Sequence, residues 1–323
     1  MTAIMLTSLV VSWLAAMVYV YQFRGQARYA GLQQYLRKSW PVFALPNALL
    51  YMFTRPWARS PFVSMDRYST LENLAQHWEV MRDEALAIQA EGSFDEARRT
   101  GSPASFDVGF RTFYKYGWSR YYLNWYGYTY ASASASCPKT LEILSRFPDI
   151  KAAMFAVLPP HSLLTPHADP LGCSLRYHLG LATPNRPECF INVDGNEQAW
   201  QDGEAFIFDE TYLHFVRNDT DLPRLILMCD VRRPMSLPGR IFNAVYSLVP
   251  RIIQTPNDER DRRGVASAMF AWFTPFLVRG KKLRARNRPL YNVVKWSINV
   301  ALMGVMLGII ATVLVVIGWL LRT

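Results

Sequence analysis

Short runs rich in apolar residues, some of them alternating with polar ones, occupy the middle of the chain. They fall at residues 152–158, 175–181, 189–193, 204–208, 212–216 and 224–231. A Pro-Pro pair, an Asp-Gly-Asn triplet and an Asp-Gly pair separate some of them. Strands of this length at regular spacing, bounded by turn residues, are typical of all-β domains. The pattern predicts a double-sheet jelly roll or barrel, which is a double-stranded β-helix of the cupin-like form.

Apolar residues at helical spacing precede these strands. Ser69 or Thr70 can cap a helix that reaches about Ala90, because apolar residues recur there every three or four positions. A second, shorter helix is expected at residues 141–146. Helices followed by a series of strands predict an α+β domain, which we place at residues 62–238.

The two ends of the chain are apolar. Residues 1–23 and 296–321 contain no charged side chain, and each stretch is long enough for a helix to cross a bilayer. A cleaved signal peptide is the alternative for the first stretch. However, no basic region precedes its apolar run and no clear small-x-small site follows it. We therefore predict a transmembrane helix at each end, flanking the jelly-roll domain.

Basic residues indicate how these helices would be oriented. Lysines and arginines follow the first stretch and precede the second, so both inner flanks belong on the cytoplasmic side. This predicts a protein of the bacterial inner (cytoplasmic) membrane with a cytosolic catalytic domain. The four cysteines form no C-x-x-C pair, which suits a reducing compartment.

Two segments beside the predicted spans combine apolar runs with basic residues. Residues 24–61 and 239–295 are expected to lie in the headgroup plane of the membrane, and packing against the soluble domain is the alternative. The net charge of +10 indicates an acidic partner. Anionic membrane lipids fit better than nucleic acid, because no nucleic-acid-binding motif accompanies the charge.

Aromatic residues gather at residues 110–130, with three basic residues among them. Such a stretch can line a path for a bulky phosphorylated substrate. Aromatic strands more often belong to a hydrophobic core, and we favour that interpretation.

Candidate metal ligands lie next to the second predicted strand. His167 and Asp169 are two positions apart, so in an extended segment both side chains leave the same face. His214 can supply a third ligand if a later strand brings it alongside. An H-x-D tripeptide alone is a weak signal, but four of the five histidines lie between His161 and His214. Two imidazoles and one carboxylate leave positions open on a metal, as in non-haem Fe(II) oxygenases.

Three basic residues in the predicted strands are candidates for binding an anion. Arg176 and His178 share one strand face, which either meets solvent or binds an anion. Arg224 opens a very apolar strand and needs a carboxylate partner if it is buried, which a dicarboxylate co-substrate would supply. The alternative for Arg224 is an ordinary strand-end residue in water.

Several motifs between residues 137 and 234 resemble one family. They are a His-x-x-Pro turn, Leu-Arg-x-His-Leu-Gly-Leu, Trp…Gly…Phe-Asp-Glu-x-x-x-His, Arg-Leu-Ile and Asp-Val-x-x-Pro, in this order. The chain resembles the aspartyl/asparaginyl β-hydroxylase family of Fe(II)- and 2-oxoglutarate-dependent dioxygenases. With its predicted spans it is similar to the membrane-bound branch, the lipid A 2-hydroxylases. Peptide-hydroxylating members have glycine where this chain has Asp169, whereas the lipid-hydroxylating branch keeps an acid.

The resemblance implies roles for the candidate residues. His167, Asp169 and His214 would be the iron ligands, and Arg224 would bind the far carboxylate of 2-oxoglutarate. Arg176 and His178 would lie near the metal-bound end of this co-substrate. A serine that helps to hold 2-oxoglutarate in peptide-hydroxylating relatives falls at Ala156 here.

The function that the resemblance implies is hydroxylation, with O2, of the C2 position of a lipid A acyl chain. The basic flanks would hold the phosphorylated headgroup at the inner leaflet. Three alternatives stay open: hydroxylation of another membrane lipid such as an ornithine lipid, peptidyl hydroxylation, and a non-enzymatic membrane protein that only binds lipid. Asp169 and the two predicted spans disfavour the peptidyl hydroxylase.

Overall fold

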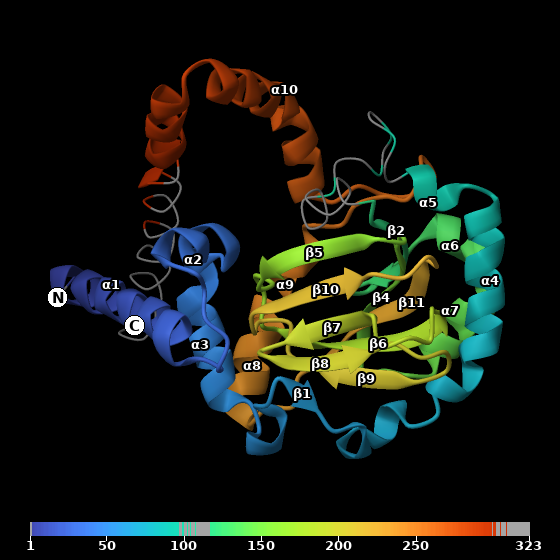
Figure 1. Cartoon of the computed structure of the whole chain (residues 1–323). Coiled ribbons are helices and arrows are strands. Elements are labelled where there is room, and N and C mark those ends of the chain that lie inside the picture. Colours follow the sequence, from blue (N-terminus) through green and yellow to red (C-terminus); the bar gives the residue numbers. More distant parts are fainter. Residues whose placement is uncertain are drawn as a thin grey trace, which may run out of the picture.

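Two antiparallel sheets and a set of helices around them make up the chain (Figure 1). The structure is a computed structural model. It describes residues 2–96 and 117–298, together with residues 99, 102, 104, 107, 300, 301, 304 and 308. The predicted α+β class is confirmed.

The strands form a large and a small sheet. The large sheet has the order β1-β9-β6-β11-β4-β2-β3 and the small sheet has the order β5-β10-β7-β8. The bounds are β1 (Phe62–Val63), β2 (Ser119–Trp125), β3 (Tyr128–Thr129), β4 (Ile150–Leu158), β5 (Ser162–His167), β6 (Ser174–Ala182), β7 (Cys189–Val193), β8 (Asn196–Ala199), β9 (Ala205–Phe208), β10 (His214–Asn218) and β11 (Arg224–Arg232). From β4 to β11 the chain passes back and forth between the sheets, with β9-β6-β11-β4 in one and β5-β10-β7-β8 in the other. This is the predicted double-stranded β-helix, or jelly roll.

The predicted strands at residues 152–158, 175–181, 189–193, 204–208 and 224–231 are confirmed with small shifts of their ends. One prediction needs correction, because the fifth predicted strand, at 212–216, begins at His214. Strands β1, β5 and β8 were not predicted. From the sequence alone, Pro166 near the end of β5 indicates a turn. However, β5 is an edge strand, where the missing N–H of a proline is tolerated.

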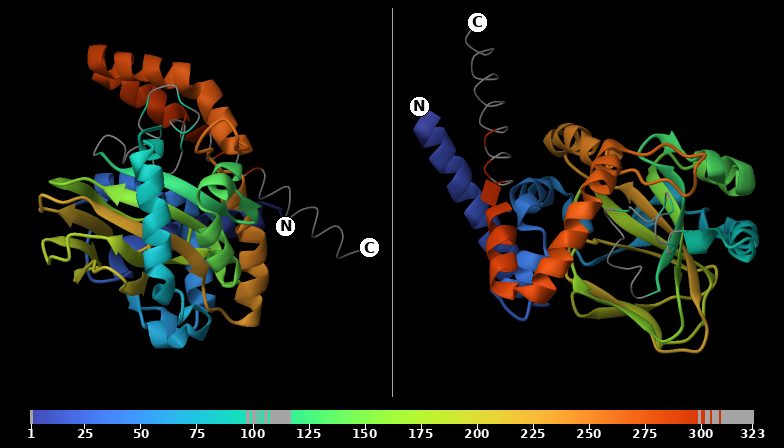
Figure 2. Two further views of the ribbon diagram at one scale, coloured as in Figure 1. Left: turned by 90° about the vertical axis from the view of Figure 1, so that its right-hand side faces the viewer. Right: turned by 90° about the horizontal axis from the view of Figure 1, so that it is seen from above.

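Helices flank the sheets on two opposite sides (Figure 2). Helix α4 contacts β6 and α7 on one side, and α3 contacts α1 and α8 on the other. The bounds are α1 (Thr2–Val18), α2 (Leu32–Lys38), α3 (Ala44–Phe53), α4 (Trp78–Ala90), α5 (Ser93–Glu96), α6 (Ala131–Ser136), α7 (Pro138–Ser145), α8 (Leu237–Tyr246), α9 (Leu248–Arg251) and α10 (Val265–Arg286). The long helix predicted from Ser69 or Thr70 starts only at Trp78, because short 3₁₀ turns occupy much of residues 69–77.

The core lies between the sheets and under the helices. Strand β11 is buried from Arg224 through Val231, so both of its faces are covered. A strand covered on both faces reads as a continuous apolar run instead of an alternating one, which explains the sequence Leu225 to Cys229. Trp118, Tyr121 and Tyr130 are also buried, so the core interpretation holds for the described part of the aromatic stretch, residues 117–130.

Among the described residues, no helix combines the length and the apolar character that a membrane crossing requires. Helix α1 has 17 residues, and a π-helical turn, Tyr19–Phe23, follows it. The span predicted at residues 1–23 is therefore not supported as a regular α-helix of that length. The span predicted at residues 296–321 lies largely outside the described residues.

Gly180 in β6 offers a test of the packing between strand and loop. A Cβ atom at this position would lie 2.0 Å from the backbone oxygen of Gln201. We expect Gly180→Ala to lower the free energy of unfolding by about 1–3 kcal/mol, as overpacking of a closed interior does. Gly31→Ala is the control, because nothing lies within 4 Å of its added Cβ. Chemical denaturation of both variants measures the difference, and equal stabilities would contradict the packing described here.

Candidate metal centre

His167 and His214 meet at one end of the small sheet. His167 is the last residue of β5 and His214 is the first residue of β10, and the antiparallel register pairs them directly. Their ring centroids are 4.3 Å apart. In Figure 1 the arrowhead of β5 and the start of β10 lie at the same end of the sheet, the end toward α2 and α3. The register therefore brings together two histidines that are far apart in sequence.

Each imidazole is fixed by a backbone carbonyl. His167 Nδ1 lies 2.8 Å from the oxygen of Thr165, and His214 Nδ1 lies 2.9 Å from the oxygen of Tyr212. A carbonyl only accepts, so each Nδ1 carries the proton and each Nε2 keeps its lone pair for a metal. Burial, together with the neighbouring His214, lowers the pKa of His167 to about 3, and burial also lowers the pKa of His214. Neutral imidazole is the form that binds a metal.

Asp169 completes the group from a loop, whereas the sequence analysis considered it in an extended segment together with His167. Strand β5 ends at His167, and the backbone N–H of Asp169 donates to the oxygen of Glu210 at 2.9 Å. Asp169 Oδ1 lies 3.7 Å from His167 Nε2. One ligand atom from each of His167, Asp169 and His214 lies within 4.8 Å of the other two. The three residues proposed from the sequence thus converge with the donor set and spacing of a metal site.

Arg176 binds the carboxylates around this site. Its guanidinium lies 3.3 Å from Asp169 Oδ2, 2.5 Å from Glu210 Oε2 and 3.0 Å from Asp230 Oδ1. Three acids around one cation leave excess negative charge in a buried space. Burial first, and then the neighbouring acids, raise the pKa of Glu210 and of Asp230, although Arg176 opposes this. Arg176 thus orients the carboxylate of Asp169, a contact that the sequence analysis did not predict.

Sequence reasoning missed Glu210 and Asp230 as members of this cluster. Both lie inside motifs that carried the family resemblance, Phe-Asp-Glu-x-x-x-His and Asp-Val-x-x-Pro. The motifs were therefore a usable signal. The missing information was that Asp230 pairs with Arg176 across the sheet and that the loop between β9 and β10 brings Glu210 to the same side chain.

Arg224 is fully buried, so the alternative of a strand-end residue in water is wrong. None of its three guanidinium nitrogens has a hydrogen-bond partner among the described residues. Its guanidinium carbon lies 4.3 Å from the ring centre of Trp200 and 5.2 Å from that of Trp118. Burial without a carboxylate lowers the pKa of Arg224 to about 10. A buried guanidinium in this state needs an anionic partner.

His178 lies near Arg224 and has one free nitrogen. Its Nδ1 accepts a hydrogen bond from Trp200 Nε1 at 3.3 Å, whereas its Nε2 has no partner among the described residues. Burial, with Arg224 and Arg176 nearby, holds the pKa of His178 well below its usual value. Neutral His178 can therefore offer hydrogen bonding to a ligand without adding charge.

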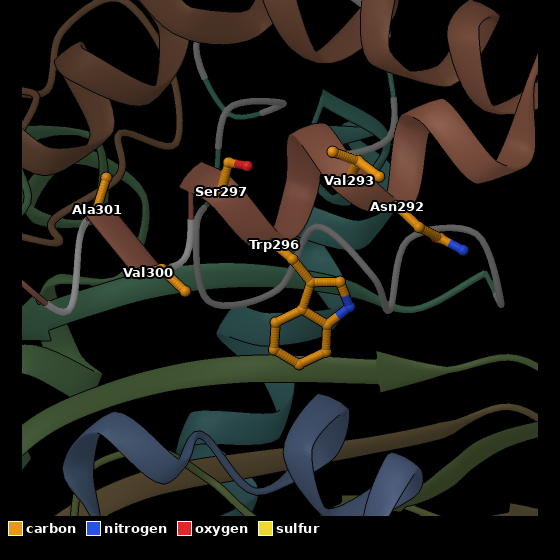
Figure 3. Close-up of a pocket in the computed structure, with 6 residues that line it drawn as sticks. All are labelled: Asn292, Val293, Trp296, Ser297, Val300 and Ala301. Carbon is orange, nitrogen blue, oxygen red and sulfur yellow. The ribbon is translucent and has the colours of Figure 1, made fainter.

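A cavity between the sheets joins these groups. Its volume is about 30 Å³, and its wall includes His167, Asp169, His214, Arg176 and His178. The remaining wall is largely apolar, with Leu164 and Met228 among its residues. Figure 3 shows a second, more open cavity of about 680 Å³ along residues 292–301. The described residues that line it include no acid, histidine or cysteine, so they offer no metal-binding or acid–base chemistry.

Comparison with known proteins gives two kinds of relatives. An ornithine lipid ester-linked acyl 2-hydroxylase of Rhizobium tropici is 34% identical over 140 residues, which cover 43% of this chain and 49% of that protein. A human aspartyl/asparaginyl beta-hydroxylase is 31% identical over 173 residues, which cover 52% of this chain and 22% of that protein. The chain therefore spans about half the length of the first relative and about a fifth of the second. A crystal structure of a Pseudomonas putida prolyl-4-hydroxylase aligns with a TM-score of 0.31 at 18% identity, covering 49% of this chain and 87% of that chain.

Removal of either imidazole tests the metal site. Loss of a contact that supports a metal ligand weakens metal binding roughly 10- to 100-fold. We expect His167→Ala and His214→Ala each to weaken Co(II) binding by more than this, because each variant removes a ligand itself. His161→Ala is the matched control, because His161 is exposed and pairs with Asp221. Titration followed by the visible absorption of bound Co(II) measures the affinity. Wild-type affinity in both site variants would refute the assignment.

The matching region of the chain includes every candidate residue of the site. Residues 75–234 match the family described as aspartyl/asparaginyl beta-hydroxylase, and this range contains both histidines and the carboxylate of the triad as well as Arg176, His178 and Arg224. The jelly-roll topology and the order of the motifs agree with that match. The domain at residues 75–234 belongs to the aspartyl/asparaginyl beta-hydroxylase family.

Proposed function

We propose that this protein is an Fe(II)- and 2-oxoglutarate-dependent dioxygenase that hydroxylates an acyl chain of a membrane lipid. One observation carries the proposal: a triad of two histidines and an aspartate lines a small cavity, and the unpaired guanidinium of Arg224 lies against Trp118, which lines the same cavity. The triad would bind the metal. The guanidinium would bind the co-substrate.

The residues fit these two groups. His167 Nε2, His214 Nε2 and an Asp169 oxygen would hold Fe(II) on one side and leave its other positions open. Arg224 would pair with the far carboxylate of 2-oxoglutarate, with His178 close to the same molecule. Bound iron with 2-oxoglutarate and O2 supplies oxidation of an unactivated C–H bond. At about 30 Å³ the cavity accommodates an ion, so entry of the dicarboxylate requires lining side chains to move.

The aspartate supports a lipid rather than a peptide substrate, on the resemblance described above. The Rhizobium relative carries the name of a lipid acyl 2-hydroxylase. Our first candidate is the C2 position of a lipid A acyl chain, with the phosphorylated headgroup held by basic residues. Ornithine lipid is the second candidate, and the name of that relative favours it.

We propose a location at the cytoplasmic face of the inner membrane, and exposed apolar side chains support contact with a membrane. Exposed apolar residues at helical spacing form a stripe along α8 and α9: Leu237, Ile241, Val245, Leu248 and Ile252. The first three side chains are more than half exposed to solvent. Val265, Met269 and Trp272 on α10 are also exposed, and Arg284 and Arg286 lie in its last turn. We propose that these faces contact anionic lipid, which suits apolar surface bordered by positive charge.

Lipid mass spectrometry of a deletion strain tests the substrate. We expect one lipid class to lose one oxygen atom per molecule when the gene is removed, and to regain it on complementation with the wild-type gene. Loss from lipid A supports the first candidate, and loss from ornithine lipid supports the second. Complementation with His214→Ala is the control, and a fully restored profile with this variant would refute the proposed chemistry.

Arg224 offers a test of the co-substrate. We expect Arg224→Ala to raise the KM for 2-oxoglutarate by at least about 30-fold, because loss of one partner of a buried charge pair costs about 2 kcal/mol or more. The turnover number at saturating 2-oxoglutarate should change less. Thermal unfolding gives a second measurement: 2-oxoglutarate should raise the Tm of the wild type and not that of the variant. An equal rise in Tm for both proteins would contradict the assignment.

A further inference from the structure

The N-terminal segment at residues 24–47 reaches the loops that carry all three candidate ligands. It precedes the family-matching region, residues 75–234, and begins where the π-helical turn after α1 ends. We call residues 24–47 the clasp. The sequence analysis assigned them to the membrane interface, whereas their polar atoms contact the metal loops.

Arg24 binds the loop that leads into His214. Its guanidinium donates to Asp209 Oδ2 at 3.0 Å and to Thr211 Oγ1 at 2.6 Å. Its carbon lies 3.5 Å from the ring centre of Tyr51 and 4.0 Å from that of Tyr212. The carbonyl of Tyr212 is the group that holds His214 Nδ1. Arg24 therefore supports the residue that orients His214.

The backbone after Arg24 adds a second contact near the same ligand. The N–H groups of Gln26 and Ala27 both donate to Asp194 Oδ1 at 2.7 Å. The N–H of Asp194 in turn donates to the oxygen of Leu213, which is the residue before His214. Two clasp contacts thus converge on residues 209–214.

The other end of the clasp holds the loop with His167 and Asp169. The N–H of Ala168, between these two ligands, donates to the oxygen of Lys38 at 3.3 Å. Asn47 donates to the oxygen of Pro170 at 2.9 Å and accepts from the N–H of Gly172 at 2.9 Å. The clasp therefore fixes the backbone on both sides of Asp169.

We propose that the clasp positions all three metal ligands and that metal affinity depends on it. The proposal rests on the proposed function, since it requires that His167, Asp169 and His214 bind a metal. Asp169 is a loop residue, so its carboxylate is only as well placed as the backbone that carries it. Outer contacts of this kind commonly set ligand orientation and affinity. By this inference the metal centre extends beyond the family domain into the segment next to the first apolar helix.

Two variants of the full-length protein test the clasp. In Arg24→Ala the carboxylate of Asp209 stays paired, because Arg233 also binds it at 2.8 and 2.9 Å. Asn47→Leu removes both contacts to the Asp169 loop. We expect each variant to bind Co(II) about 10-fold more weakly or worse and to shift its visible absorption bands. Arg28→Ala is the matched control, because Arg28 is exposed and, among the described residues, its side chain donates to backbone oxygens of the clasp itself.

The shift of the absorption bands distinguishes displaced metal ligands from a general loss of protein stability. A less stable protein has a smaller folded fraction, but the spectrum of its bound metal is unchanged. Wild-type affinity and spectrum in both variants would overturn the proposal. A wild type that binds no Co(II) would instead refute the metal site itself.

A measurement on the wild type covers the case in which the variants do not fold. Coupling between two sites is reciprocal, so metal binding should slow amide hydrogen exchange in the clasp as well as in residues 165–172 and 209–214. Slower exchange at Ala27, Ala168 and their neighbours would support the proposal. Protection of the two loops with unchanged exchange throughout residues 24–47 would overturn it.

Discussion

The antiparallel pairing of β5 with β10 is the constraint on which the site depends. Neighbouring residues of a strand point to opposite faces, so a slip of one residue would turn His214 away from His167. The pairing shifts by one residue between His214 and Val216, where the strand has a β-bulge or similar irregularity. Beyond this point Asn218, which is fully buried, pairs with Ser162 of β5 and donates to the oxygens of Pro159 and Leu222. The backbone pairing together with this irregularity therefore decides whether the two imidazoles can share a metal.

The two arginines near the cavity illustrate two solutions to burying a cation. Arg176 has three carboxylates, which compensate its charge and leave that cluster negative. Arg224 has none among the described residues and stacks between two indole rings instead. Cation–π contacts offset only part of the cost of burying a charge. A protein that keeps such a residue gains a pocket tuned for an anion. The contrast explains why Arg224, and not Arg176, is the better candidate for the far carboxylate of a co-substrate.

The sequence was sufficient for the central strands and for naming three side chains that the structure brings together, and insufficient for what supports them. Alternation and turn residues predicted most strands because those signals are local. His167, Asp169 and His214 followed from residue type and spacing. The partners of Arg176 did not, because Asp230 on β11 and Glu210 in the loop after β9 reach it only when distant parts of the chain fold together. Strand β5 was missed because Pro166 resembles a turn. Residues 24–61 were assigned to the membrane because an apolar, basic segment has the same composition whether it meets lipid or protein.

Arg24 shows why a count of basic residues needs structural correction. It was counted with the cations facing lipid phosphate, yet it is buried against Asp209. The net charge available to the membrane nevertheless stays positive, because the buried arginines are largely matched by buried acids. Arg120 pairs with Asp107, Arg233 with Asp209 and Arg176 with Asp230. Paired charges cancel inside, so the positive excess of the chain resides mainly on its surface. Attraction to an anionic bilayer thus follows from the pairing of the interior as much as from composition.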